Sequence, residues 1–481
     1  MKQNTSVLKR AGIMAALLVT AGFTVKAQER ITLQQAVDRM LANNLNIKQA
    51  QVTEAIGYAD LQQSKNNLLP SLNGSSNGGY NFGRSQVAGT FAFSNQASFN
   101  VNANAQMNVT LFQGGQLRNQ IIQNRLTVDV NQSNTAKIKN DLILNVVTTY
   151  LQILVNQDLV TAAKQQIDIA NQNQQRVQIS FDAGKNTLAD LSQAKAQSAT
   201  ANLNLTNAEN QLNISVLTLK QLMEMNPYTE ITVERPDISR LTNVQTAYDA
   251  NEVANTALGI NPDIKLAEAR ERTFAQSIKI AKGAYYPTLS MYGNLASSYS
   301  NRFTQILGYT PPTFPVIGKV EGSNTSVISV TPSVSPIQGP YPFLDQFRNN
   351  FNQGVGLSLQ IPIFNRFLAH TNVKKAQLNY QNAQLNTQLS KNNLTKIIMQ
   401  AVLDLNAATK QYQSATQTFE ANRDALNVTQ QRYDVGLVNS LDYNTAVTNF
   451  NRSQNDMIQA QYAVIFRSKI IDYYLGKTIT L

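Results

Sequence analysis

The chain has 481 residues, of which 42% are hydrophobic and only 14% are charged. It contains no cysteine and one histidine, His370, so disulfide frameworks, cysteine nucleophiles and clustered Cys or His metal sites are excluded. The formal charge of +11 falls by four, to +7, without residues 1–27, because that segment carries four basic residues and no acidic one. A surplus this dilute does not indicate a nucleic-acid-binding protein.

Residues 1–27 have the pattern of a secretory signal peptide. Basic residues precede an apolar run at 11–23, and Val25-Lys26-Ala27 resembles a small-residue cleavage site before Gln28. A membrane anchor is the alternative, but the run is shorter than the ~20 residues that a spanning helix needs. No later stretch is apolar for long enough to span a bilayer as a helix. We therefore expect the mature chain to be either soluble or inserted as β-strands.

The rest of the chain shows two copies of one pattern. A constant offset of 252 residues relates three pairs: Phe112 with Phe364, Gly184 with Gly436, and Asp190 with Asp442. Nearer the start of each half the offset is 217, so the second half contains about 35 additional residues before Phe351. We expect an internally duplicated fold, with structural repeats at 28–223 and 251–481 and a linker, or equatorial segment, at 224–250.

Each repeat is predicted to contain two strands, at about 71–82 and 97–113 and at about 288–299 and 351–363. The strongest signal runs from Phe99 to Leu111, where apolar residues alternate strictly with Asn, Gln and Thr. A strand with one apolar and one polar face is typical of a membrane β-sheet that separates lipid from water. A face of a soluble β-sandwich is the alternative. Pro70 and Pro287 mark the helix-to-strand transitions, and the Pro-rich stretch at about 300–350 is expected to be a long surface loop.

Four long helices are predicted, at about 115–181, 187–223, 366–433 and 439–475. The first and third lack proline and glycine in their interiors, so each forms a rod of roughly 100 Å at 1.5 Å per residue. Their apolar stripes are narrow and their other positions polar, which favours packing beside similar rods. Gly184 and Gly436 are expected to cap the rods in left-handed conformation and reverse the chain into antiparallel hairpins.

Four strands per chain cannot close a barrel, since eight is the bacterial minimum. An open sheet edge in lipid would leave backbone groups unpaired at several kcal/mol each. Sister copies must therefore complete the ring, two giving eight strands and three giving twelve.

Local motifs together with the repeated order carry a family resemblance. The motifs are Leu69-Pro70-Ser71-Leu72, Tyr286-Pro287-Thr288-Leu289 and Tyr433-x-x-Gly436 followed by Leu441-Asp442. With the signal peptide and the duplicated helix–strand–strand–helix–helix order, the chain resembles the TolC family of outer-membrane efflux proteins over essentially all of 28–476. The resemblance implies a mixed α+β membrane protein. Its long α-helical periplasmic barrel would be continuous with a trimeric twelve-stranded β-barrel, and the loop at about 300–350 would be extracellular.

The resemblance also implies location and partners. The protein would lie in the cell outer membrane and extend into the periplasm, as a homotrimer in contact with outer-membrane lipid. A periplasmic adaptor (membrane fusion) protein and an inner-membrane transporter would be its partners, with no nucleic acid. Its function would be a passive conduit in a tripartite efflux or type I secretion system. We expect no enzyme activity, catalytic residues, metal or cofactor, because acidic residues are scattered singly. A secreted coiled-coil scaffold or adhesin without a pore is the alternative.

Residue by residue, the resemblance places a periplasmic gate at Asp190, Tyr433 and Asp442. Asp190 and Tyr433 match the positions of a link within one protomer, and Asp442 matches an acidic ring that narrows the entrance. A charge at a helix N-terminus is the alternative for each Asp, and core packing is the alternative for Tyr433.

The turns at the ends of the hairpins are the expected contacts with the adaptor. The residues predicted to make them are Gly184, Lys185, Gly436 and Leu437.

Overall fold

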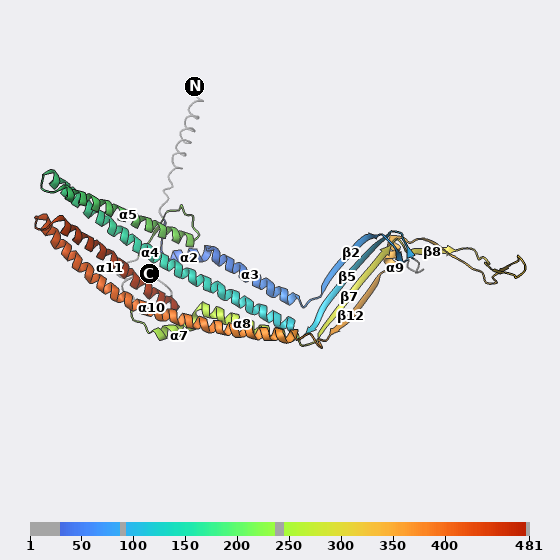
Figure 1. Ribbon diagram of the computed structural model, residues 1–481. Helices are drawn as coiled ribbons and strands as arrows, with labels where there is room; N and C mark the ends of the chain where they lie inside the picture. Colours follow the sequence, from blue (N-terminus) through green and yellow to red (C-terminus); the bar gives the residue numbers. More distant parts are fainter. Residues whose placement is uncertain (1–28, 87–92, 236–244, 478–481) are drawn as a thin grey trace, which may run out of the picture. The chain divides into compact units, whose positions relative to one another are not determined.

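The computed structural model describes residues 29–86, 93–235 and 245–477 (Figure 1). The predicted signal peptide, 1–27, lies outside the described residues. The chain divides into two compact units. The first contains Met1–Gly57, Thr127–Arg272 and Asn382–Leu481, and the second contains Tyr58–Leu126 and Thr273–Gln381. Over the described ranges, no helix is both long enough and apolar enough to cross a membrane.

Long helices dominate the chain. The helices are α2 (Leu33–Asn43), α3 (Leu45–Asn66), α4 (Gln116–Asp182), α5 (Leu188–Leu222), α7 (Ala250–Ile260), α8 (Pro262–Gly283), α9 (Phe343–Asn349), α10 (Leu368–Asp434) and α11 (Ser440–Tyr474). Helices α4 and α10 have 67 residues each, and α5 and α11 have 35 each. The spans predicted for these four helices begin and end within about two residues of the observed bounds.

Two apolar cores hold the first unit together. One joins α2, α4, α5 and α11 around Met40, Val146, Ile153 and Leu219, all fully buried. The other joins α7, α8, α10 and α11, with Ile398 and Ile471 fully buried. Each helix contributes only a narrow buried stripe, so the polar residues between these positions remain at the surface.

The predicted linker at 224–250 contains a strand. Strand β6 (Ile231–Val233) pairs in parallel with β1 (Glu29–Ile31). The hydroxyl of Tyr150, which is buried on α4, donates a 2.6 Å hydrogen bond to the carbonyl oxygen of Glu234. This pair of strands is therefore fastened to the long helix that it crosses. Burial raises the pKa of the Tyr150 hydroxyl, so it remains a hydrogen-bond donor at neutral pH.

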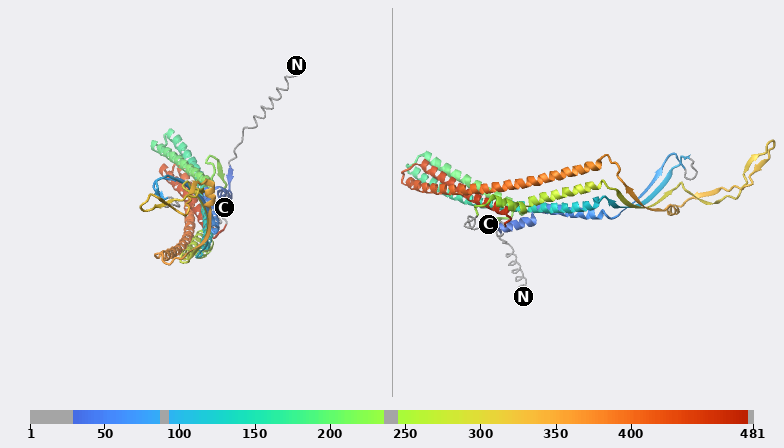
Figure 2. Two further views of the ribbon diagram at one scale, coloured as in Figure 1. Left: turned by 90° about the vertical axis from the view of Figure 1, so that its right-hand side faces the viewer. Right: turned by 90° about the horizontal axis from the view of Figure 1, so that it is seen from below.

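Within the first unit, the segments of four helices lie side by side in the order α3, α4, α8, α10. In Figure 2, right, they follow one another as blue, cyan, yellow-green and orange ribbons. The linking contacts are Asn131 Nδ2 to Thr53 O at 3.3 Å, Lys137 to Asp263 at 2.8 Å and Lys391 to Glu268 at 2.8 Å. Helices α3 and α10 are thus the two outer members of this layer.

The second unit is built on one antiparallel sheet. Its strands are β2 (Ser71–Asn81), β5 (Ser98–Gln113), β7 (Thr288–Ser300) and β12 (Asn352–Gln360), in the spatial order β12-β7-β5-β2. Along the chain, α3 leads into β2, β5 leads into α4, α8 leads into β7, and β12 leads into α10. The strands of the sheet therefore follow the same order as the helices. The predicted fourth strand, 351–363, is too long at its end, because Pro362 has no N–H with which to continue a ladder.

The register gives this sheet one apolar and one polar face. Leu72, Met107, Gly293 and Val355 are paired in a row across the four strands. The neighbouring row, on the opposite face, contains Asn73, Gln106, Asn294 and Gly354. Because successive residues of a strand point to opposite faces, the faces of β5 continue across the sheet, although β2 contributes Gly and Ser at several positions of the apolar face.

Aromatic residues lie at both ends of the apolar face. At one end Tyr80 and Phe99 have ring centroids 4.7 Å apart, and Tyr299 contacts Phe99 at 6.3 Å. The other end carries Phe112 on β5 and Phe364 just after β12, both exposed.

The stretch at 300–350, predicted as a long surface loop, is largely exposed and contains short elements of regular structure. It contains β8 (Thr304–Tyr309), β9 (Val316–Lys319), β10 (Ser326–Ile328), β11 (Pro336–Pro340) and α9. Strand β8 pairs with β11, and β9 pairs with β10. The density of prolines suggested a loop, but the prolines lie between the short strands or at their ends, as Pro336 and Pro340 do in β11, where a missing N–H is tolerated. A further short pair, β3 (Ser85–Gln86) and β4 (Phe93–Ser94), lies between β2 and β5.

Candidate functional site

The turns of the two long hairpins carry most of the residues predicted for function. Gly184 lies two residues after the end of α4, at the start of the turn to α5, with φ of +70°. Gly436 has the same place between α10 and α11, with φ of +79°. The following N–H groups, of Lys185 and Leu437, each donate a 2.8 Å bond back to a carbonyl of the last helical turn. Open space surrounds both glycines, so it is the left-handed backbone that requires them.

Side-chain caps begin both returning helices. Thr187 and Asp190 form a reciprocal capping box, with Asp190 N donating to Thr187 Oγ1 and Thr187 N donating to Asp190 Oδ2. At the equivalent place Asn439 Oδ1 accepts a 2.8 Å bond from Asp442 N. Asp190 and Asp442 therefore both stand in the first turn of a helix, where the helix dipole favours a negative charge.

Asp190 also joins the two hairpins. Ser440 Oγ, at the start of α11, donates a 2.7 Å hydrogen bond to Asp190 Oδ1. This bond, and the bonds that Thr187 donates, hold the pKa of the Asp190 carboxyl below its ordinary value. Sequence reasoning missed Ser440, because the residue 252 positions earlier is Leu188 and the repeat gave no signal there.

Tyr433 lies in a different set of contacts. Its ring stacks on Tyr443 at 4.7 Å with an interplanar angle of 8°, and the guanidinium of Arg176 lies 5.9 Å from its centroid. Burial raises the pKa of the Tyr433 hydroxyl, and the nearby Arg176 opposes that rise. Tyr443, Leu426 and Val447 form a small buried cluster beside it. Asp190 is thus hydrogen-bonded to Ser440 and Tyr433 packs against an aromatic ring, while the charge of Asp190 contributes to the raised pKa of the Tyr433 hydroxyl.

A second polar link joins the hairpins from the other pair of helices. Arg176 on α4 forms an ion pair with Asp434, the last residue of α10. Both side chains are more than a third exposed, so a pair of this kind is worth about 0–1 kcal/mol. Two residues distant in sequence make this contact, and no local pattern predicts it.

The ends of the hairpins are open to solvent. Lys185 and Asp442 are exposed, as are Leu188, Leu437 and Leu441. Leu437 is 70% exposed, and its position in the turn does not bury its apolar side chain. The tips therefore combine apolar side chains with both basic and acidic groups.

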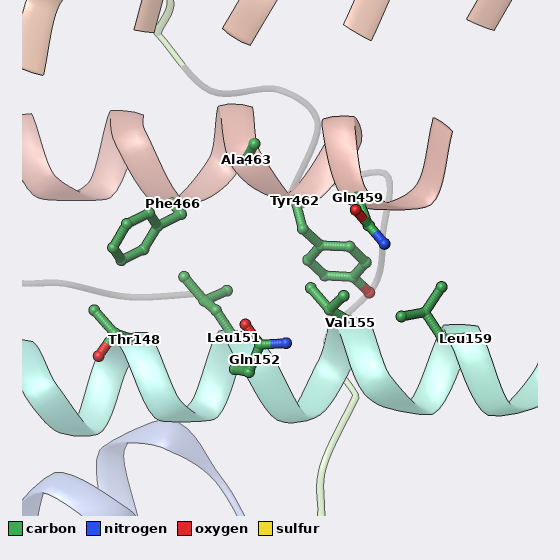
Figure 3. A pocket seen from close by; sticks show the side chains of 9 residues that line it. All are labelled: Thr148, Leu151, Gln152, Val155, Leu159, Gln459, Tyr462, Ala463 and Phe466. Atoms are coloured by element: carbon green, nitrogen blue, oxygen red, sulfur yellow. The ribbon is translucent and has the colours of Figure 1, made fainter. Parts of the chain in front are cut away.

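A groove runs between α4 and α11 (Figure 3). It has a volume of about 460 Å³, and its lining includes Leu151, Val155, Tyr462 and Phe466. The Tyr462 hydroxyl donates a 2.9 Å bond to Asp158. The lining has no acid, base or nucleophile set suited to catalysis.

Other predicted positions lie away from the tips. Pro70 and Pro287 stand immediately before β2 and β7, where each helix gives way to its strand. In the ranges that the structure describes, no group of three or more His, Cys, Asp or Glu residues could hold a metal ion.

Comparison with known proteins identifies the family. The outer membrane efflux protein family model matches residues 36–223 and 253–476. Toxin and drug export protein A of Aggregatibacter actinomycetemcomitans is 24% identical over 441 residues, covering 90% of this chain and 83% of that protein. Outer membrane protein TolC of Salmonella enteritidis is 20% identical over 463 residues, covering 95% and 84%. The crystal structure of the Campylobacter jejuni CmeC outer membrane channel superposes with a TM-score of 0.70 at 18% identity, covering 92% and 85%.

These matches confirm the predicted resemblance to TolC and the predicted location in the outer membrane. The named relatives are channel and export proteins, in keeping with a role in efflux. The chain belongs to the outer membrane efflux protein family.

Proposed function

We propose that three copies of this chain form a passive conduit through the outer membrane and the periplasm. The observation that carries the proposal is the four-stranded sheet with one apolar face, one polar face and two open edges. The outer edges of β2 and β12 have no partner strand among the described residues. Three copies joined edge to edge would give twelve strands in a closed ring, which satisfies the backbone groups that lipid cannot.

The two outer helices, α3 and α10, support the same arrangement, in which one edge of each copy joins the opposite edge of the next. On α3 the exposed side chains Leu45, Val52 and Ile56 form an apolar stripe. On α10 Leu385, Leu389, Met399 and Leu403 form another. Such stripes are costly in water, and a heterologous interface that closes a ring would bury each against the other.

The apolar face has the height of a bilayer core. From Phe99 to Phe112 the strand β5 advances thirteen residues, or about 43 Å, which a tilt near 45° reduces to about 30 Å. Aromatic rings at both ends of this band correspond to the girdles of membrane strands. The Asn-, Gln- and Ser-rich face would then line water, in a duct with few apolar contacts to retain solutes.

The hairpin tips would form the gated periplasmic entrance. The Asp190–Ser440 and Arg176–Asp434 contacts hold the two hairpins of one chain together, and their loss would let the hairpins separate. Asp442 is exposed, and three copies would place three carboxylates around the axis, which attracts cations.

The exposed turns would dock a periplasmic adaptor, with Gly184, Lys185, Gly436 and Leu437 at the contact. The adaptor would connect the conduit to an inner-membrane transporter that supplies the energy. The name of one relative joins toxin and drug export, so a tripartite efflux pump and a type I secretion system both fit. The equal lengths of α4 and α10, and of α5 and α11, support two structural repeats per chain.

Reconstitution tests the proposal. The purified protein should have the mass of a trimer by light scattering in detergent, and should give stepwise conductance in planar bilayers. A secreted scaffold or adhesin predicts neither result. A monomer that leaves the bilayer silent would reject the conduit and favour that alternative.

A further inference from the structure

A two-stranded arm, defined as residues 304–340, extends from the four-stranded sheet. Strands β8 and β11 form its base and β9 and β10 its outer part. A bridge between Thr313 and Ser333 joins the two pairs into one ribbon. Figure 1 shows the ribbon running on from the end of the sheet at which α9 lies.

The surface of the arm is unusually apolar. Of its residues only Lys319 and Glu321 are charged. Twelve large apolar side chains on it are exposed, and Val330 is 95% exposed. Others include Ile306, Leu307, Val316, Ile317 and Ile328. An apolar surface of this extent on a slender ribbon indicates that something covers it.

The arm also lacks partners for its backbone. No third strand pairs with it in the part of the chain that the structure describes. A lone two-stranded ribbon is marginally stable in water, and its unpaired edges are templates for another strand. Natural edge strands are usually protected by charged residues, of which the strands of this arm have one, Lys319.

We propose that the arm of a neighbouring copy of this chain covers it, so that three arms associate side by side into a crown. The proposal rests on the proposed trimer, which brings three identical arms to the same end of the sheets. Charge supports a copy as the occupant, because an arm with net charge would be repelled by its twin. Here Lys319 and Glu321 cancel, and their opposite signs near the tip allow pairing between adjacent arms.

Cysteine crosslinking can test this arrangement, because the natural chain has no cysteine. Two-stranded ribbons packed edge to edge repeat at about 10 Å, twice the strand spacing. In the full-length protein in liposomes, Ile317→Cys with a bismaleimide long enough for that distance should therefore give covalent dimers and trimers. Ser71→Cys, exposed on β2, is the control, because equivalent β2 residues in a twelve-stranded ring lie about 19 Å apart or more.

A second variant tests the nature of the contact. Val316→Lys with Val330→Lys, added to Ile317→Cys, places like charges on adjoining arms and should lower the crosslink yield by about fivefold or more. The two positions are not cross-strand partners within one arm, so the β9–β10 pair is kept. Both native side chains are exposed, so the sheet and the trimer should be retained. An unchanged yield in this variant would overturn association through the apolar surface.

Each other result is decisive. A trimer of the expected mass whose arms do not crosslink would overturn the crown and leave the proposed conduit standing. A monomer without conductance would overturn both. Crosslinks from the arm to a different protein in native membranes would overturn the proposal. It would also be overturned if lipid, without a second copy, protected the thiol of Ile317→Cys from a water-soluble maleimide.

Discussion

Ser440, at the start of α11, donates a 2.7 Å hydrogen bond to Asp190 in the first turn of α5, although 250 residues separate the two. The carboxylate is held at the same time by its own helix cap at Thr187. One acidic side chain thus stabilises a helix terminus and fastens two hairpins together. The helix cap, which was the alternative interpretation of Asp190, is thus present together with a contact to Ser440, whereas the predicted link to Tyr433 stays a prediction.

Ser440→Ala should loosen this link. Loss of one such bond at a half-exposed site is worth about 1 kcal/mol, or about fivefold in the ratio of separated to joined hairpins. We expect the open probability in planar bilayers to rise by about that factor. Thr445→Ala is a matched control, because the Thr445 hydroxyl bonds within its own helix, to the carbonyl oxygen of Leu441. Equal effects of both substitutions would contradict a specific role for Ser440.

The link should depend on pH with a defined sign. Because the folded-state pKa of Asp190 is lowered, its stabilisation is present above the ordinary Asp value of about 3.9 and is lost as pH falls through the lowered pKa. Open probability should therefore be constant from pH 7 to about 5 and rise only in stronger acid. In Asp190→Asn this acid-dependent rise should be absent. A transition near neutral pH that survives in Asp190→Asn would assign the titration to another group.

The Arg176–Asp434 pair should respond to salt. Both side chains are partly exposed, so 1 M salt, with a Debye length of about 3 Å, should screen much of their attraction. A double-mutant cycle with Arg176→Ala and Asp434→Ala, read from open probability, should give a coupling energy of no more than about 1 kcal/mol that shrinks at high salt. Arg452→Ala is the control, since Arg452 pairs with Asp456 within α11. A coupling energy that salt leaves unchanged would count against the ion pair.

Asp442→Asn should reduce cation preference. Removing three carboxylates around the axis removes attraction of about 0.5 kcal/mol each at 8 Å in water, before screening. We expect the cation-to-anion permeability ratio, from reversal potentials in a salt gradient, to fall roughly threefold. Asp456→Asn removes an exposed charge farther along the same helix and should change the ratio less. Unaltered selectivity in Asp442→Asn would remove this residue from the entrance.

Gly114→Ala should destabilise the second unit. Gly114 has φ of +56°, and an added Cβ would overlap the carbonyl oxygen of Gly283 at the end of α8. The backbone strain alone costs on the order of 1–3 kcal/mol. Gly259→Ala, next to the last residue of α7 and with no atom within 4 Å of the added Cβ, should instead stabilise by up to about 0.5 kcal/mol. Thermal unfolding followed by circular dichroism should shift in opposite directions for the two variants.

Cysteines at the hairpin tips should crosslink to an adaptor. Lys185→Cys and Leu437→Cys place single thiols on the two exposed turns. In cells that contain the assembled system, a short bismaleimide should join them to the periplasmic partner. Thr371→Cys, exposed near the start of α10 and far along the helix from its tip, should not react in this way. Failure of both tip variants in an assembled complex would reject docking at the turns.

Features that depend on near neighbours in the chain could be predicted from the amino-acid pattern alone. Strict alternation in β5 located an amphipathic strand, because side chains of a strand alternate between faces. Long runs without proline or glycine located α4 and α10, and Gly184 and Gly436 located the turns between helices. These are local consequences of backbone geometry, and the expected spans of the long helices lie within about two residues of the observed ones.

Contacts between residues far apart in the chain became visible only in the folded molecule. Ser440 reaches Asp190, and Arg176 reaches Asp434, because two hairpins from different halves of the chain lie together. No periodicity encodes such a contact, and the Pro-rich ribbon at 304–340 was missed for the same reason. Its strands are short, and their pairing depends on residues that become neighbours only when the chain folds back on itself.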